Sequence, residues 1–150
     1  MTLEEKINND IKAAMLARDQ IRLDAVRAIK AAILVERKSG NSKEFTEESE
    51  IKLLQRLVKQ RKESAEIYAQ QNRPELAEKE IAEAKVIEIY LPVQMSEEEI
   101  EAAVKEIIAE TGTTSIKEMG KVMGIVTKQL SGKADGKLIA DTVKRLLNSL

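Results

Sequence analysis

The sequence contains no cysteine and no histidine, and these two absences exclude several kinds of site. Without cysteine there is no disulfide framework, no thiolate nucleophile and no cysteine-based metal site. Without histidine the chain lacks the commonest general base and the commonest metal ligand. Classical catalytic triads and zinc sites are therefore excluded, and we predict no metal, no other cofactor and no self-contained catalytic residues.

Aromatic residues and long apolar runs are also scarce. The only aromatic residues are Phe45, Tyr68 and Tyr90, so a core has to be built from aliphatic side chains, which suits closely packed helices. No apolar run approaches the roughly 20 residues of a membrane-spanning helix. The first residues, MTLEEKINNDIK, are too acidic and polar for a secretory signal. From these absences we predict a cytoplasmic protein with no membrane partner.

Apolar residues recur with a helical period along most of the chain, and the alternation typical of strands is absent. We predict an all-α fold with an amino-terminal domain over 1–92, made of about four helices in hairpins. A small three-helix domain follows over 93–150, because Pro92 ends a helix and begins an extended connector. The predicted helices are Leu3–Ala17, Gln20–Ser39, Glu47–Gln71, Pro74–Tyr90, Glu97–Glu110, Ile116–Leu130 and Lys137–Ser149.

Capping residues and apolar stripes support these helix boundaries. Three Ser/Thr–Glu pairs have the spacing of a capping box, namely Thr2 with Glu5, Ser96 with Glu99 and Ser115 with Glu118. Asp19 and Thr46 are further predicted N-caps, and Gly40 and Gly112 are predicted to end helices. The inward faces are predicted from the periodic apolar positions. They include Ile7, Met15, Val26, Ile29, Leu34, Leu54, Ile81, Ile87 and, unusually for a charged residue, Arg61.

Two glycines four residues apart, Gly120 and Gly124, interrupt a helical pattern. Each costs about 1 kcal/mol relative to alanine inside a helix, so some compensating role is expected. One explanation is a close approach by a phosphate, a base or another helix from outside. The other, which we favour from sequence alone, is close helix packing within the small domain.

A second glycine-containing segment, Gly132–Gly136, stands before the last predicted helix. The free amides of a helix start could bind an anion there, helped by Lys133 and Lys137. The segment lacks the spacing and the preceding strand of a nucleotide-binding P-loop. Equally, it could be a tight turn in which Asp135 caps the helix. The sequence leaves both interpretations open.

Charged residues elsewhere are interpreted as solvated surface. The basic run comprises Lys52, Arg56, Lys59, Arg61 and Lys62 and could contact phosphates. A helix face paired with Glu48, Glu63 and Glu66 is the favoured interpretation. The carboxylates Glu78, Glu80 and Glu83 have suitable spacing for acid–base chemistry, but nothing in the sequence indicates burial.

Charge is unevenly distributed along the second predicted domain. Residues 93–115 contain one basic and six acidic residues, whereas residues 116–150 contain seven basic and three acidic ones, a net charge of +4. This asymmetry could steer an anionic partner towards the carboxy-terminal segment.

Several short motifs, taken in order, resemble one known family. In the second half these are Met119–Gly124, Gly132–Gly136 and Val143–Leu147. In the first half they are Asp10–Met15, Arg22–Arg27, Lys59–Ser64 and Tyr90–Gln94. Together they resemble the YqeY-like family across essentially the whole chain. The carboxy-terminal domain of that family is similar to the tail domain of the B subunit of tRNA-dependent Asp/Glu amidotransferases.

The resemblance implies an all-helical protein with a three-helix carboxy-terminal domain. In the amidotransferase, the tail domain is associated with tRNA recognition and a separate domain transfers the amide. The resemblance therefore implies a link to carbon–nitrogen ligase activity with glutamine as amido-N-donor. The present chain has no room for that separate catalytic domain, and whether it is an enzyme is left open.

We therefore predict an accessory module that binds tRNA. The predicted contact residues are Gly120, Lys121, Gly124, Lys128, Gly132, Lys133, Gly136, Lys137 and Lys144. A second hypothesis is a protein-interaction module that binds an aminoacyl-tRNA synthetase or an amidotransferase subunit without touching RNA. A third hypothesis is an amidotransferase subunit that is itself catalytic, and it is less favoured because no nucleophile–base pair is identifiable.

Overall fold

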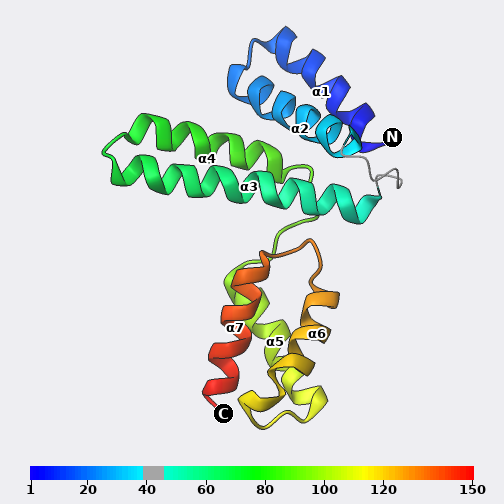
Figure 1. The fold of residues 1–150 in the computed structure, drawn as a ribbon, viewed down its shortest axis with the longest axis vertical. Coiled ribbons are helices and arrows are strands. Elements are labelled where there is room, and N and C mark those ends of the chain that lie inside the picture. The colour runs from blue at the N-terminus through cyan, green and yellow to red at the C-terminus, as the bar shows by residue number, and fades with distance from the viewer. Residues whose placement is uncertain (39–45) are drawn as a thin grey trace. The chain divides into compact units, whose positions relative to one another are not determined.

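A computed structural model describes residues 1–38 and 46–150 of the chain (Figure 1). The described residues contain seven α-helices, one short 3₁₀ helix and no strand, which confirms the all-α prediction. The elements are α1 (Leu3–Ala17), α2 (Gln20–Lys38), α3 (Glu47–Gln70), α4 (Pro74–Glu88), α5 (Glu97–Thr111), η1 (Ile116–Glu118), α6 (Met119–Gln129) and α7 (Gly136–Asn148). The predicted helix end at Ser39 and the predicted stop at Gly40 lie outside the described residues.

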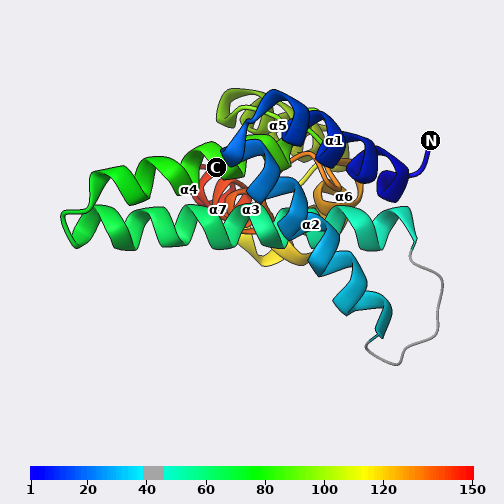
Figure 2. The same cartoon turned by 90° about the horizontal axis from the view of Figure 1, so that it is seen from above.

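The chain divides into two units, Met1–Pro92 and Val93–Leu150. In the first unit, α1 and α2 form one antiparallel hairpin and α3 and α4 form a longer one (Figures 1 and 2). Helix α2 packs on α4 and also touches α3, so it joins the two hairpins. The core where they meet includes the fully buried side chains Ile7, Val26, Ile29 and Ile87.

The second unit is a bundle of α5, α6 and α7, in which each helix packs on the other two. Its core is aliphatic and is built around Ile100, Val104, Val122, Val126 and Val143, all fully buried. The two cores are separate clusters, so each unit has its own source of hydrophobic stabilisation.

The capping predictions hold at most helix starts. Thr2 with Glu5 and Ser96 with Glu99 form complete capping boxes. Gly112 ends α5 with a φ of 67°, which suits glycine. The box predicted at Ser115 is wrong. The Ser115 hydroxyl accepts from the Lys117 amide and opens η1, so the α-helical part starts only at Met119.

Three residues predicted to face inward are exposed instead. Met15 is 54% exposed, Leu34 is 41% exposed and Ile81 is 39% exposed. Each of them fits the apolar periodicity of its own helix. A hairpin partner covers only part of an apolar stripe, however, and the width of that covered part is decided by packing between helices. Periodicity therefore found the buried face but overestimated its extent.

Candidate nucleic-acid interface

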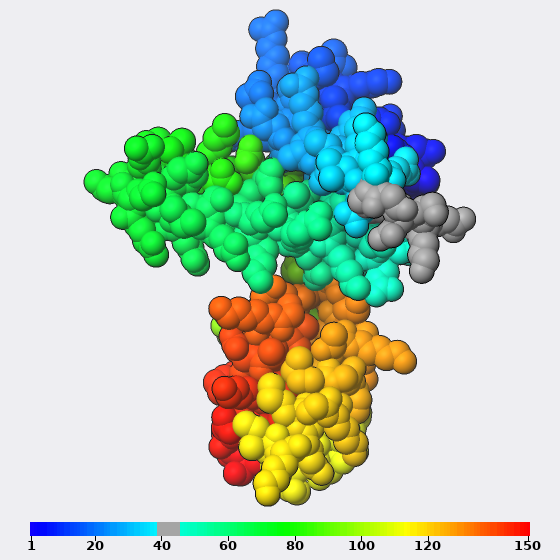
Figure 3. Space-filling model, in the orientation of Figure 1, coloured from blue at the N-terminus to red at the C-terminus, as the bar shows by residue number. Residues whose placement is uncertain are grey.

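Helix α6 has a buried apolar side and a bare side. Val122 and Val126 are fully buried in the core of the second unit. Gly120 and Gly124 are exposed. Because residues four apart lie on the same side of a helix, the two glycines form a strip of bare backbone facing solvent. Part of α6, coloured amber, lies at the surface of the second unit in Figure 3.

Nothing among the described residues fills the space above this glycine strip. A Cβ atom placed on Gly120 or Gly124 would meet no heavy atom within 4 Å. The favoured sequence interpretation, close packing against a helix of the same domain, is therefore wrong. The glycines weaken α6 without a packing gain in this part of the chain. Their exposed backbone remains open to a close approach from outside.

The five lysines predicted to contact RNA are all exposed. Lys121 and Lys128 are seven residues apart on α6, about two helical turns, so they share one side of that helix. Lys137 and Lys144 have the same spacing on α7, and Lys133 lies in the turn between the helices. Within 1–38 and 46–150, none of the five forms an ion pair. Their charges are therefore available to an anionic partner.

The turn before α7 is held by the connector that enters the second unit. Gly132 is buried and has a φ of 76°, a conformation that favours glycine. Its carbonyl accepts a hydrogen bond of 2.8 Å from Gln94 Nε2. The Lys133 carbonyl accepts one of 2.8 Å from the Met95 amide. Gly132 thus forms the turn, whereas the exposed Lys133 side chain is held at the surface beside it.

Asp135 decides between the two interpretations of this segment. Its carboxylate accepts from the Leu138 amide at 3.3 Å and caps α7. The start of the helix therefore already carries a negative group, which disfavours an anion at the same place. The structure shows the tight turn capped by Asp135. Gly136 is exposed, and a Cβ atom placed on it would meet no heavy atom within 4 Å.

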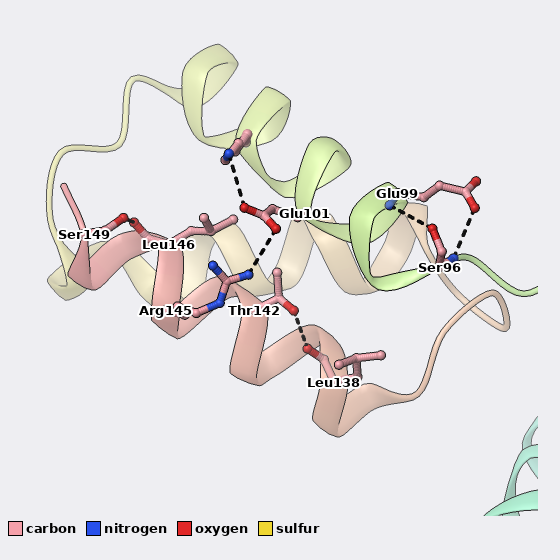
Figure 4. A network of polar contacts seen from close by, with 9 residues as sticks. Ser96, Glu99, Glu101, Leu138, Thr142, Arg145, Leu146 and Ser149 are labelled. Atoms are coloured by element: carbon pink, nitrogen blue, oxygen red, sulfur yellow. Dashed lines mark hydrogen bonds and ion pairs between the residues drawn. The ribbon is translucent and has the colours of Figure 1, made fainter.

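Glu101 on α5 pairs with one basic residue of its own helix and with one of α7. Glu101 accepts from Lys105 at 3.2 Å and from Arg145 at 3.4 Å (Figure 4). These donated hydrogen bonds and the two positive charges lower the pKa of Glu101. Beside them lies an acidic hollow of about 260 Å³ that Glu97, Glu98 and Asp141 also line. Arg145 is therefore engaged within the protein, unlike the five lysines.

The basic run on α3 is engaged as well. Lys52 pairs with Glu48 at 3.4 Å, Arg56 with Glu36 at 3.9 Å and Lys62 with Glu88 at 3.0 Å. The interpretation of a paired, solvated helix face is confirmed, although Glu36 and Glu88 serve as partners and the expected Glu63 and Glu66 do not. No lysine on α3 other than Lys59 remains without an ion pair in the described ranges.

One carboxylate interpreted as surface is in fact buried. Glu83 is 8% exposed and pairs with Arg61 across the α3–α4 hairpin. Its pKa is raised, chiefly because burial disfavours the charged form. The signal in the sequence was Arg61, a charged residue on an inward-facing stripe, since a buried arginine needs a partner on a neighbouring helix.

A second polar cluster joins Tyr90, which follows α4, to one residue of α1 and one of α2. Asp10 on α1 accepts a hydrogen bond from the Tyr90 hydroxyl and pairs with Arg22 on α2 at 3.4 Å. Burial, followed by the hydrogen bond to Asp10, raises the pKa of Tyr90. All three residues belong to motifs that carry the family resemblance, but only the tertiary structure brings them together.

Two kinds of feature are absent from the described residues. No helix in these ranges is both long and apolar enough to cross a bilayer. No group of three or more acidic side chains in the same ranges is arranged to hold a metal ion.

Comparison with known proteins gives one family. Residues 4–147 match the family described as Yqey-like protein. A protein of Kluyveromyces lactis named "Altered inheritance of mitochondria protein 41, mitochondrial" is 33% identical over 92% of this chain and 72% of its own length. The protein of the same name from Lachancea thermotolerans is 34% identical over 69% of this chain and 57% of its own length. The protein of the same name from Pyrenophora tritici-repentis is 29% identical over 96% of this chain and 80% of its own length.

These names overturn one prediction. Each of the three relatives is named as a mitochondrial protein, which contradicts the predicted cytoplasmic location. That prediction used the absence of a secretory signal and of a membrane span. Neither absence distinguishes the cytoplasm from an organelle, so the inference went further than its premises.

Proposed function

Because the chain belongs to the YqeY-like family, we propose that its carboxy-terminal unit binds tRNA as an accessory module. The proposal rests on two observations, the bare strip of Gly120 and Gly124 on α6 and five exposed lysines that form no ion pair in the described ranges, namely Lys121 and Lys128 on α6, Lys133 in the following turn, and Lys137 and Lys144 on α7. Lysines that already have a carboxylate partner would lose that partner on binding a phosphate. These five have no such competition.

The chemistry of the unit favours phosphate contacts over contacts to bases. All three aromatic residues of the chain precede residue 93, so the second unit has no ring on which an unpaired base could stack. Lysines bind phosphates as point charges, and the glycine strip would let the RNA backbone lie close to α6. Binding of this kind releases counterions and weakens steeply as salt rises.

The resemblance of this unit to an amidotransferase tail domain supports tRNA as the first RNA to test. In our proposal the module brings tRNA to a partner that performs the chemistry. Among the described residues, the unit offers cationic and bare backbone surface but no nucleophile beside a base. Gly132 forms the turn that holds Lys133, and Gly136 follows that turn at the start of α7. We propose that these two glycines position Lys133 rather than contact RNA themselves.

The test is binding of the full chain to unfractionated tRNA across a salt series, with Lys121→Ala/Lys133→Ala as the variant. We expect affinity to fall steeply with salt, and the variant to bind several-fold more weakly with a salt slope reduced by about one for each lysine. The matched control is Lys52→Ala/Lys62→Ala, which removes two lysines that are paired within the first unit.

Equal loss in the control and the variant would show that only bulk charge matters and would reject the assigned surface. Absence of binding even at low salt would reject direct RNA contact altogether. It would leave the alternative of a module that binds a synthetase or amidotransferase subunit. A complex captured through that alternative route would survive nuclease treatment.

A further inference from the structure

The last residue of the motif Tyr90–Gln94 contacts the turn that carries Lys133. Gln94 lies in the connector that precedes α5, and this connector runs beside the turn between α6 and α7 (Figure 1). The Nε2 atom of Gln94 donates a hydrogen bond of 2.8 Å to the Gly132 carbonyl. An uncharged residue of the connector is therefore bonded directly to the turn that presents one of the five lysines.

Lys133 differs from the other four lysines of the proposed surface in its local structure. The other four lie within α6 or α7, where the hydrogen bonds of the helix fix the direction in which a side chain leaves the backbone. Lys133 lies outside both helices. The direction of its side chain therefore has to be fixed by contacts of the turn itself.

Three hydrogen bonds hold the backbone on both sides of Lys133. The Gly132 carbonyl and the Lys133 amide belong to one planar peptide group. The carbonyl accepts from Gln94 Nε2 at 2.8 Å, and the amide donates to the Leu130 carbonyl at 3.0 Å. The next peptide group is held as well, because the Lys133 carbonyl accepts from the Met95 amide at 2.8 Å. With both peptide planes held, the direction of the Lys133 Cα–Cβ bond is set.

Gln94 supplies the one bond of these three that depends on a side chain. The other two donors are the backbone amides of Lys133 and Met95, which every residue except proline provides. Gly132 is buried, so water has little access to its carbonyl and is a poor substitute for the Gln94 amide. The identity of residue 94 thus decides whether the turn is fully held.

We infer that Gln94 is a positioning residue for Lys133, which it holds in place for a phosphate of the bound RNA. This inference rests on the proposed function. A turn that is ordered before binding loses less conformational entropy when its lysine engages a phosphate, so the affinity is higher. Gln94 contributes through Lys133 and needs no contact with RNA of its own.

The competing explanation is that Gln94 only stabilises the second unit. Leu130 and Ala134, on either side of the turn, are both buried in the core, and Asp135 caps α7. If these contacts alone held the turn, removing the Gln94 bond would lower stability without changing how Lys133 binds RNA. The two explanations differ in whether the effects of Gln94 and Lys133 on binding depend on each other.

The test is a double-mutant cycle on binding of the full chain to unfractionated tRNA at one fixed, low salt concentration. Gln94→Met keeps the size of the side chain and removes the donor without adding charge. It should weaken binding about two- to five-fold, and no more than Lys133→Ala does. In the Lys133→Ala background the same change should have no further effect. In the Lys144→Ala background it should have its full effect, because Lys144 is held by α7.

The matched control is Gln129→Met in the same unit. Gln129 is exposed, and its side chain forms no hydrogen bond in the described ranges, so this variant should bind tRNA as the unaltered chain does. Gln94→Asn is a second variant, whose amide is one methylene too short to reach Gly132, and it should behave like Gln94→Met. The ¹⁵N–¹H spectrum without RNA checks that each variant is folded. In both Gln94 variants amide exchange should accelerate at Met95 and Lys133.

The possible outcomes separate this inference from the proposed function. Unchanged binding by the folded Gln94 variants, or an equal loss in the Lys133→Ala background, would overturn the inference and leave the proposed function standing. An equal loss for Gln129→Met would overturn it too, and so would unchanged amide exchange at Met95 and Lys133, which is measured without RNA. Absence of tRNA binding by the unaltered chain would reject the proposed function, and the inference with it.

Discussion

The two units carry nearly balanced numbers of acidic and basic residues but use their charges differently. In the described part of Met1–Pro92 most ion pairs join different helices, as Glu4 with Arg37 and Lys62 with Glu88 do. In Val93–Leu150 ion pairs are confined to Glu101 and its two partners, and six lysines, the five assigned to the interface and Lys117, form none. Net charge therefore says little about binding. What matters is whether a cation already has a carboxylate within reach.

The two units also differ in which residues do not contribute to the stability of the fold. The first unit buries the poorly satisfied pair of Arg61 and Glu83. The second unit exposes Gly120 and Gly124 on a helix where no neighbouring atom packs against them. Glycine is a weaker helix former than alanine, and a buried ion pair with few hydrogen bonds is expected to add little stability. Such features are where binding sites are to be sought, because natural proteins keep costly local choices mainly for function.

The largest expected effect on stability comes from creating a cavity in the core of each unit in turn. Ile29 and Ile100 are both fully buried, one in each unit. Ile29→Ala and Ile100→Ala should each destabilise their own unit by about 2–5 kcal/mol. Because the cores are separate, amide hydrogen exchange should accelerate in the unit that carries the change and stay nearly unchanged in the other. Equal acceleration in both units would show that they unfold as one.

A smaller effect is expected from breaking the buried pair. Arg61→Ala leaves the Glu83 carboxylate without its cation and should destabilise the first unit by about 2 kcal/mol. Arg61→Met/Glu83→Met removes both charges and should recover most of that loss. Denaturant unfolding measures both. A double variant that is less stable than Arg61→Ala would mean that the pair stabilises the fold.

Replacing a glycine of the exposed strip by alanine is expected to stabilise the second unit. Gly124→Ala should stabilise the second unit by about 1 kcal/mol, since the new methyl group meets no atom and alanine is the better helix former. The same change should weaken tRNA binding if the backbone of α6 is approached closely. Gly112→Ala is the contrasting control, and it should destabilise because φ is 67° there. Unchanged tRNA binding by Gly124→Ala would remove the strip from the interface.

The smallest effect is in the pH dependence of stability, to which one carboxyl group in each unit should contribute with opposite sign. The pKa of Glu83 is raised, so the folded state holds its proton more tightly and this group's contribution to stability falls as pH rises above 4.5. The pKa of Glu101 is lowered, so its contribution is present above pH 4.5 and is lost as pH falls below that value.

Denaturant unfolding of the chain and of its Glu83→Gln and Glu101→Gln variants between about pH 3 and 7 would separate these contributions. The difference between the unaltered chain and Glu83→Gln should decrease with rising pH. The difference for Glu101→Gln should increase. Parallel curves for either variant would show that the carboxyl concerned has the same pKa folded and unfolded.

The sequence by itself determined most of the helix starts, because the signals for them are local. Capping residues such as Thr2 and Ser96 act on the next three amides, and the apolar period is a property of each helix alone. The predicted starts at Leu3, Gln20, Glu47, Pro74 and Glu97 are all confirmed. The family, too, followed from short motifs that the chain carries in order.

The tertiary structure alone decided which side chains meet and which face water. Whether Gly124 is packed or bare, whether Met15 is covered and whether Glu83 is buried all depend on helices distant in sequence. The same holds for Asp10 and Tyr90, which are 80 residues apart and form one hydrogen bond. Burial and pairing are properties of two surfaces at once, and one helix's periodicity contains no information about the second surface.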